Sequence, residues 1–184
     1  MAGHVGGRKY HIPIADKVYE LAEALPERLS ASVYPAAGCG CRLGGTLALE
    51  VAHVNFLRRE VPIAQQLKVI AGRRPYLVAL KTKTSYRTVE LPESVAVPLA
   101  RHIELYPPVE VEIEIETDPR NPRRRKALLL FTSARGEAMQ RATWSRIWAA
   151  SAKAVGMPPR WGYHGLRHYF ATLLIHGGAP AGAA

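Results

Sequence analysis

The stretch His164-Gly165-Leu166-Arg167-His168 opens the last helix that the sequence predicts, which continues from about Leu166 to Ile175. His164 and Arg167 are three residues apart, so their side chains share one face of a helix. An imidazole can give or accept a proton near neutral pH, and a planar guanidinium offers paired donors that fit a phosphate. This pair is therefore the first group of candidate functional residues.

Two more basic segments lie upstream of this stretch. Gly40-Cys41-Arg42-Leu43-Gly44 is predicted at a junction between helices, because its glycines permit a tight turn there. Lys81-Thr82-Lys83 is predicted at the end of a hairpin, among turn-forming residues between two short strands. The chain thus presents an arginine, a hairpin lysine and a histidine-arginine pair, in that order.

Helices and strands follow from the spacing of apolar residues. The other predicted helices cover residues 15–25, 27–34, 44–51, 93–105 and 143–155. The predicted strands cover residues 61–70, 76–81, 87–91, 109–116 and 127–131. In 109–116, apolar residues alternate strictly with glutamates, as in a strand with one face in water. We therefore predict an α+β fold, mainly helical with a small antiparallel sheet, in which 127–131 pairs with 109–116.

The chain has 184 residues and carries 25 Lys and Arg against 15 Asp and Glu, a net charge of +10. Its length is typical of one domain, and its charge predicts a polyanionic partner, because basic side chains that neutralise phosphates release counterions. The candidate DNA contacts lie at hairpin ends and in the turn after 109–116, and they are Arg73, Arg74, Lys83, Arg123, Arg124 and Arg125. For the turn, a solvated loop that balances the glutamates is an open alternative.

Composition also argues against several classes of protein. The longest stretch without Asp, Glu, Lys or Arg, residues 168–184, contains glycines and a proline, so no membrane helix is predicted. No apolar run follows the basic residues 8 and 9, so we expect no secretory signal and a cytoplasmic protein. Cys39 and Cys41 are too close for an ordinary disulfide and too few for a zinc site, and we expect free thiols.

In their order along the chain, the three basic segments quoted above resemble those of the tyrosine recombinases, or phage-type integrases. The resemblance is closest to integrases of actinobacterial type, through residues 54–61, 85–89 and 129–133. A His-x-x-Arg motif alone would be weak, but its place after all the other segments makes the match specific. The resemblance implies the catalytic-domain fold of that family over residues 13–178, incomplete at both ends, with flexible segments over residues 1–12 and 179–184.

The resemblance also implies a chemistry. In this family a tyrosine attacks a DNA phosphodiester, and neither a metal nor a nucleotide cofactor is needed. By resemblance, Arg42 and Arg167 clamp the phosphate, because paired guanidinium donors suit its oxygens. Lys81, or Lys83 as the second choice, protonates the departing 5′ oxygen. His164 exchanges a proton with the nucleophile or holds the phosphate.

The chain departs from the family in several places. Gly45 stands where an acidic residue is usual, and Gly165 stands where Asp is common. Tyr163 and Tyr169 flank the motif too closely to match the family's attacking tyrosine, and no tyrosine lies further along. His168, like Tyr169, is expected to support packing.

Three interpretations of the function follow. We predict a DNA-binding remnant of a site-specific recombinase from a phage or mobile element, connected with DNA integration and recombination, that binds double-stranded DNA but does not cleave it alone. The alternative is an active component that receives its tyrosine from another recombinase subunit. A second alternative is a basic protein that binds RNA or no polymer.

Overall fold

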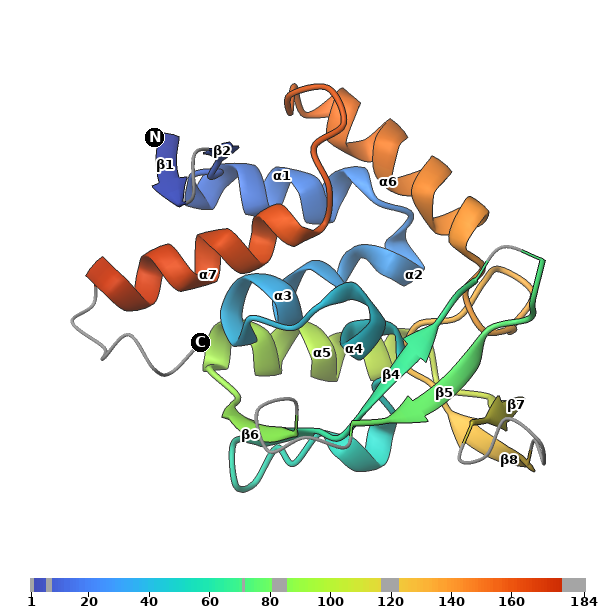
Figure 1. Cartoon of the computed structure of the whole chain (residues 1–184). Helices are drawn as coiled ribbons and strands as arrows, with labels where there is room; N and C mark the ends of the chain where they lie inside the picture. The colour runs from blue at the N-terminus through green and yellow to red at the C-terminus, as the bar shows by residue number, and fades with distance from the viewer. Residues whose placement is uncertain (1, 6–7, 71, 81–85, 117–122, 177–184) are drawn as a thin grey trace.

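Helices form most of the fold, and the larger sheet lies to one side of them (Figure 1). The structure is a computed structural model that describes residues 2–5, 8–70, 72–80, 86–116 and 123–176. Lys81, Lys83 and the predicted 179–184 segment lie outside the described residues. Within the described part of the chain, no helix is long and apolar enough to cross a membrane.

The long helices agree with the sequence to within two residues at each end. The helices are α1 (Ala15–Ala24), α2 (Glu27–Ser30), α3 (Val33–Cys39), α4 (Leu43–Leu47), η1 (Val51–His53), α5 (Glu93–Leu105), α6 (Arg141–Ala154) and α7 (His164–His176). The helix predicted over 27–34 was wrong in one respect, because it is divided into α2 and α3. Pro35 lies in the first turn of α3, where a proline costs no helical hydrogen bond. The helix predicted over 44–51 is likewise divided into α4 and the short η1.

The strands form three sheets. They are β1 (Ala2–Val5), β2 (Arg8–His11), β3 (Glu60–Ile63), β4 (Gln65–Lys68), β5 (Tyr76–Ala79), β6 (Arg87–Glu90), β7 (Glu110–Ile115) and β8 (Arg123–Leu128). β1 pairs with β2 inside the segment expected to be flexible, and β3 pairs with β6. The other four strands form one sheet in the order β4-β5-β7-β8. The fold class is as predicted, but the sheet is not.

Two details of the predicted sheet are corrected. The single strand expected over 61–70 is two strands in different sheets, β3 and β4. The sheet is also mixed, because β5 and β7 run parallel. A parallel pair needs a long connection between its strands, and here β6 and α5 supply it.

The basic run Arg123–Lys126 was expected in a turn and instead begins β8. β8 pairs antiparallel with β7, which carries the alternating glutamates, along the whole length of both strands. Cross-strand ion pairs follow, at 2.8 Å between Lys126 and Glu110 and at 3.5 Å between Arg124 and Glu112. Both pairs join diagonal positions of the two strands, and opposite charges placed in this way favour the pairing of the basic run with β7.

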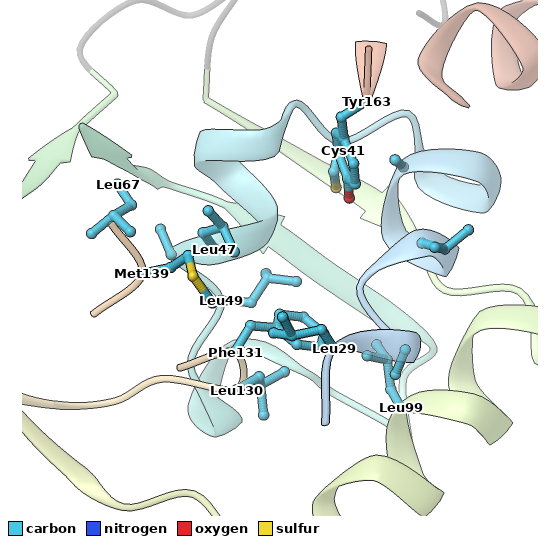
Figure 2. Packing of buried hydrophobic residues seen from close by; sticks show 14 of the residues in the cluster. Leu29, Cys41, Leu47, Leu49, Leu67, Leu99, Leu130, Phe131, Met139 and Tyr163 are labelled. Carbon is cyan, nitrogen blue, oxygen red and sulfur yellow. The ribbon is translucent and has the colours of Figure 1, made fainter. Parts of the chain in front are cut away.

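The core lies where the helices meet the strands, and Phe131 is a fully buried member of it. Figure 2 shows Phe131 together with Leu29, Leu99 and Leu130. The ring of His102 on α5 packs on the Phe131 ring with centroids 5.0 Å apart. Helix α3 contacts α1, α5 and α7, so the end of α3 is held between the helical layers. This end leads directly into Arg42.

Candidate phosphate site

The backbone carbonyl of Gly40 brings two arginines together. The Arg87 Nη2 donates to it from β6 over 3.0 Å, and the Arg167 Nη1 donates to it from α7. Gly40 caps α3 with a φ of +62°, a left-handed conformation that favours glycine. The ring of Phe170 leaves no room there for a side chain, since a Cβ would lie 2.5 Å from its Cδ1. The turn predicted from the glycines is thus the meeting point of three elements.

Arg42 lies two residues after this turn. It takes an extended conformation just before the first turn of α4, and its side chain is exposed. Burial, together with the charges of Arg87 and Arg42, lowers the pKa of Arg167. Among the described residues, no carboxylate forms an ion pair with any of these three arginines. Their repulsion is therefore not relieved by a described acidic group.

His164 lies in the first turn of α7, on the same face as Arg167. Its ring packs edge to face on the ring of His168, with centroids 4.6 Å apart and 81° between planes. Partial burial, followed by His168, Arg167 and Arg42, lowers the pKa of His164. At neutral pH this imidazole is therefore mainly neutral, with one nitrogen able to accept a proton.

The two cysteines lie beneath this cluster and are free thiols, as predicted. Burial raises the pKa of Cys41 to about 12, although the guanidinium groups of Arg87 and Arg167 act in the opposite direction. The Cys39 thiol contacts the Glu90 carbonyl oxygen at 3.4 Å. Both sulfurs stay protonated at neutral pH, so they add no negative charge to the site. In the described part of the chain, no three His, Cys, Asp or Glu side chains are placed to hold a metal ion.

The arginines predicted to contact DNA have different surroundings. Arg73 donates to Glu114 and, over 2.8 Å, to Glu116, and its guanidinium lies 3.9 Å from the centre of the Tyr76 ring. Arg125 forms an ion pair with Glu50 over 2.5 Å. The other candidate arginines are exposed: Arg74, Arg123 and Arg124. Arg124 forms an ion pair with Glu112 over 3.5 Å.

Sequence reasoning missed Arg87 as a site residue. Residues 85–89 were noted only as part of the resemblance to the integrases, and no role was predicted for Arg87. A signal was available, because Arg87 begins β6 a few residues after Lys81 in the sequence. The hairpin predicted around Lys81 was wrong in its pairing, since β5 and β6 lie in different sheets. The distance of 47 residues between Arg87 and Gly40 hid the contact between them.

Both tyrosines that flank the motif pack inside the fold. The Tyr163 hydroxyl donates to the Ser32 carbonyl over 2.5 Å and lies 2.9 Å from the Thr46 hydroxyl. Burial raises the pKa of Tyr163 far above its ordinary value. Tyr169 lines a small hollow that also contains Tyr19 of α1 and Val95 of α5. Tyr163 is thus buried, and Tyr169 is partly buried against α1 and α5.

The sequence profile described as the phage integrase family matches residues 14–184. A tyrosine recombinase XerC-like protein of Caldanaerobacter subterraneus subsp. tengcongensis is 26% identical over 187 residues, which cover 90% of this chain and 43% of that protein.

Two solved structures show the same fold. The Tn1549 transposon integrase, in complex with transposon right end DNA, superposes with a TM-score of 0.76 at 18% identity, covering 92% of this chain and 55% of that one. The XerA recombinase superposes with a TM-score of 0.61 at 21% identity, and the match covers 96% of this chain and 54% of that one. The chain thus spans less than half of the curated relative and about half of each solved chain. The predicted fold class, that of a recombinase catalytic domain, is confirmed.

Proposed function

Because the chain belongs to the phage integrase family, we propose that it binds duplex DNA and holds one backbone phosphate among Arg42, Arg87, Arg167 and His164. The observation that carries the proposal is that Arg87 and Arg167 meet at the Gly40 carbonyl, with the charge of Arg42 acting on Arg167 and no described carboxylate in an ion pair with any of the three. Such repulsion costs free energy, and an anion with several acceptor oxygens relieves it. The DNA complex of the Tn1549 integrase, which has the same fold, supports duplex DNA as the source of that anion.

The site suits a phosphoryl group for a chemical reason. In transfer at phosphorus, negative charge grows on the non-bridging oxygens, and donors held in place around them lower the barrier. Arg87 and Arg167 each use part of their guanidinium on Gly40 and keep further N–H groups, since each has five. A neutral His164 can accept the proton of an attacking hydroxyl. We assign Lys81, with Lys83 as the alternative, to the departing oxygen.

The first test measures binding of a labelled DNA duplex across a range of salt concentrations. We expect the logarithm of the affinity to fall linearly with the logarithm of the salt concentration. The double variant Arg42→Ala/Arg167→Ala should bind more weakly, and its slope should be lower by about 0.9, the value for one phosphate. Arg101→Ala/Arg146→Ala is the matched control, because it removes the same two charges from exposed positions on α5 and α6.

Two outcomes would count against this proposal. An unchanged titration for the double variant would remove Arg42 and Arg167 from the DNA interface. An RNA hairpin that competes as well as duplex DNA would favour the RNA-binding alternative.

The second test concerns strand cleavage. We propose that neither Tyr163 nor Tyr169 acts as the nucleophile, so that residues 1–184 alone do not cleave DNA. Tyr163 is buried and hydrogen-bonded, and Tyr169 packs toward α1 and α5. An attacking hydroxyl must instead reach the phosphorus directly.

The experiment uses a nicked suicide duplex that traps a phosphotyrosine. With this chain alone, we expect no covalent protein–DNA band. With an added peptide that carries the tyrosine-bearing segment of the XerC-like relative, we expect a band on the peptide. A band on the chain itself, mapped by mass spectrometry to Tyr163 or Tyr169, would contradict the proposal.

A further inference from the structure

Trp161 precedes α7 and joins it to two other parts of the fold. Its indole Nε1 donates to the backbone carbonyl of His11, at the end of β2, over 3.0 Å. Its own carbonyl accepts a hydrogen bond from the indole Nε1 of Trp148 on α6, also over 3.0 Å. The two indole rings stack with centroids 5.7 Å apart and 20° between planes. Trp161 is therefore held from both sides.

The same ring covers Gly165 in the first turn of α7. A Cβ on Gly165 would lie 2.3, 2.4 and 2.6 Å from three atoms of the indole of Trp161. These distances are far inside van der Waals contact. The ring cannot move aside without losing its bond to His11 and its stack on Trp148. Gly165 thus keeps space for the indole at a helical position where alanine would otherwise be more favourable.

We infer that Trp161 is a positioning residue for the phosphate site and that Gly165 is its required counterpart; the site's role rests on the proposed function. His164 and Arg167 lie on either side of Gly165 in one helical turn, so any displacement of this turn moves both groups. Arg167 must reach Gly40 and His164 must pack on His168, which leaves little freedom for the turn. The indole sets the turn against β2 and α6, and it thereby couples the N-terminal strand to the site.

A double-mutant cycle tests the inference with Gly165→Ala, Trp161→Ala and the combination of the two. In Gly165→Ala, the methyl group should displace the indole. We expect faster hydrogen exchange of the Trp161 indole N–H, shifted imidazole resonances of His164, and a loss of duplex affinity of about tenfold, the effect of one charge-assisted hydrogen bond. In the Trp161→Ala background the space is empty, so Gly165→Ala should cause no further loss and should raise the melting temperature.

Two further variants serve as controls. Trp161→Phe keeps a ring on Trp148 but removes the donor to His11, and its effects should be intermediate. Gly162→Ala should change nothing, because no atom lies within 4 Å of a Cβ at that position.

The outcomes separate this inference from the proposed function. Unchanged indole exchange and His164 resonances in Gly165→Ala would overturn the inference, as would an equal loss of affinity in both backgrounds. If the resonances respond as expected but the wild-type chain does not bind duplex DNA, the positioning role stands and the proposed function falls.

Discussion

Replacement of Phe131 by alanine is expected to lower the free energy of unfolding by about 3–5 kcal/mol, the usual cost of deleting a buried aromatic ring. The Phe131 side chain is 0% exposed. The ring of His102 packs on it, and the His102 imidazole is itself tied to the Leu130 carbonyl at 2.8 Å. Because these neighbours come from separate elements that are anchored elsewhere, they cannot close the space that the ring leaves.

Equilibrium unfolding in urea gives the measurement. Phe131→Leu should cost clearly less, since it keeps part of the volume. Val97→Ala on α5 is the surface control, because Val97 is 58% exposed, and it should change the free energy by less than about 0.5 kcal/mol. Equal losses for Phe131→Ala and Val97→Ala would show that this part of the core is not packed as described.

Replacement of Glu50 by alanine is expected to cost about 2–3 kcal/mol at pH 7, between the values for exposed and fully buried ion pairs. The Glu50 side chain is 12% exposed, and that of Arg125 is 33% exposed. Arg125 donates to both carboxylate oxygens of Glu50, and Gln65 donates to one of them over 2.8 Å. The change would leave a half-buried guanidinium without its charged partner. It would also remove the contacts of Glu50, which follows α4, with Arg125 of β8 and Gln65 of β4.

The dependence on pH gives a second measure of this pair. Burial alone would raise the pKa of Glu50, but the hydrogen bonds from Arg125 and Gln65 outweigh it and hold the pKa below its ordinary value. A carboxyl whose pKa is lower in the folded state stabilises the fold fully above its unfolded pKa of about 4.3. This contribution is lost as the pH falls through the folded value. The difference in stability between wild type and Glu50→Gln should therefore shrink as the solution is acidified.

Glu112→Ala is the matched control for this prediction. The Glu112 side chain on β7 is 65% exposed and lies 3.5 Å from Arg124 on β8. Its loss should cost less than about 0.5 kcal/mol at any pH. If Glu112→Ala and Glu50→Ala were equally destabilising, the Glu50 network would have no special role.

Local patterns in the sequence were enough to predict the long helices α1, α5, α6 and α7 and one turn of the site. Helix α5 was predicted at its observed ends, because a proline precedes it and its apolar residues repeat at helical spacing. The strand β7 was evident from its alternating glutamates. His164 and Arg167 were placed together for the same reason, since residues three apart on a helix are neighbours whatever the rest of the chain does.

Contacts between distant segments were decided only by the tertiary structure. Arg87 and Arg167 meet at Gly40 because β6 and α7 both pack beside the end of α3, and no local pattern encodes that meeting. Arg73 and Arg125 were predicted to contact DNA, with charge balance against the glutamates as the alternative for Arg125, and the fold places Glu114 and Glu116 against Arg73 and Glu50 against Arg125. The physical reason is that periodicity specifies which face a residue lies on, whereas the role of a charge depends on the group that packing places opposite it.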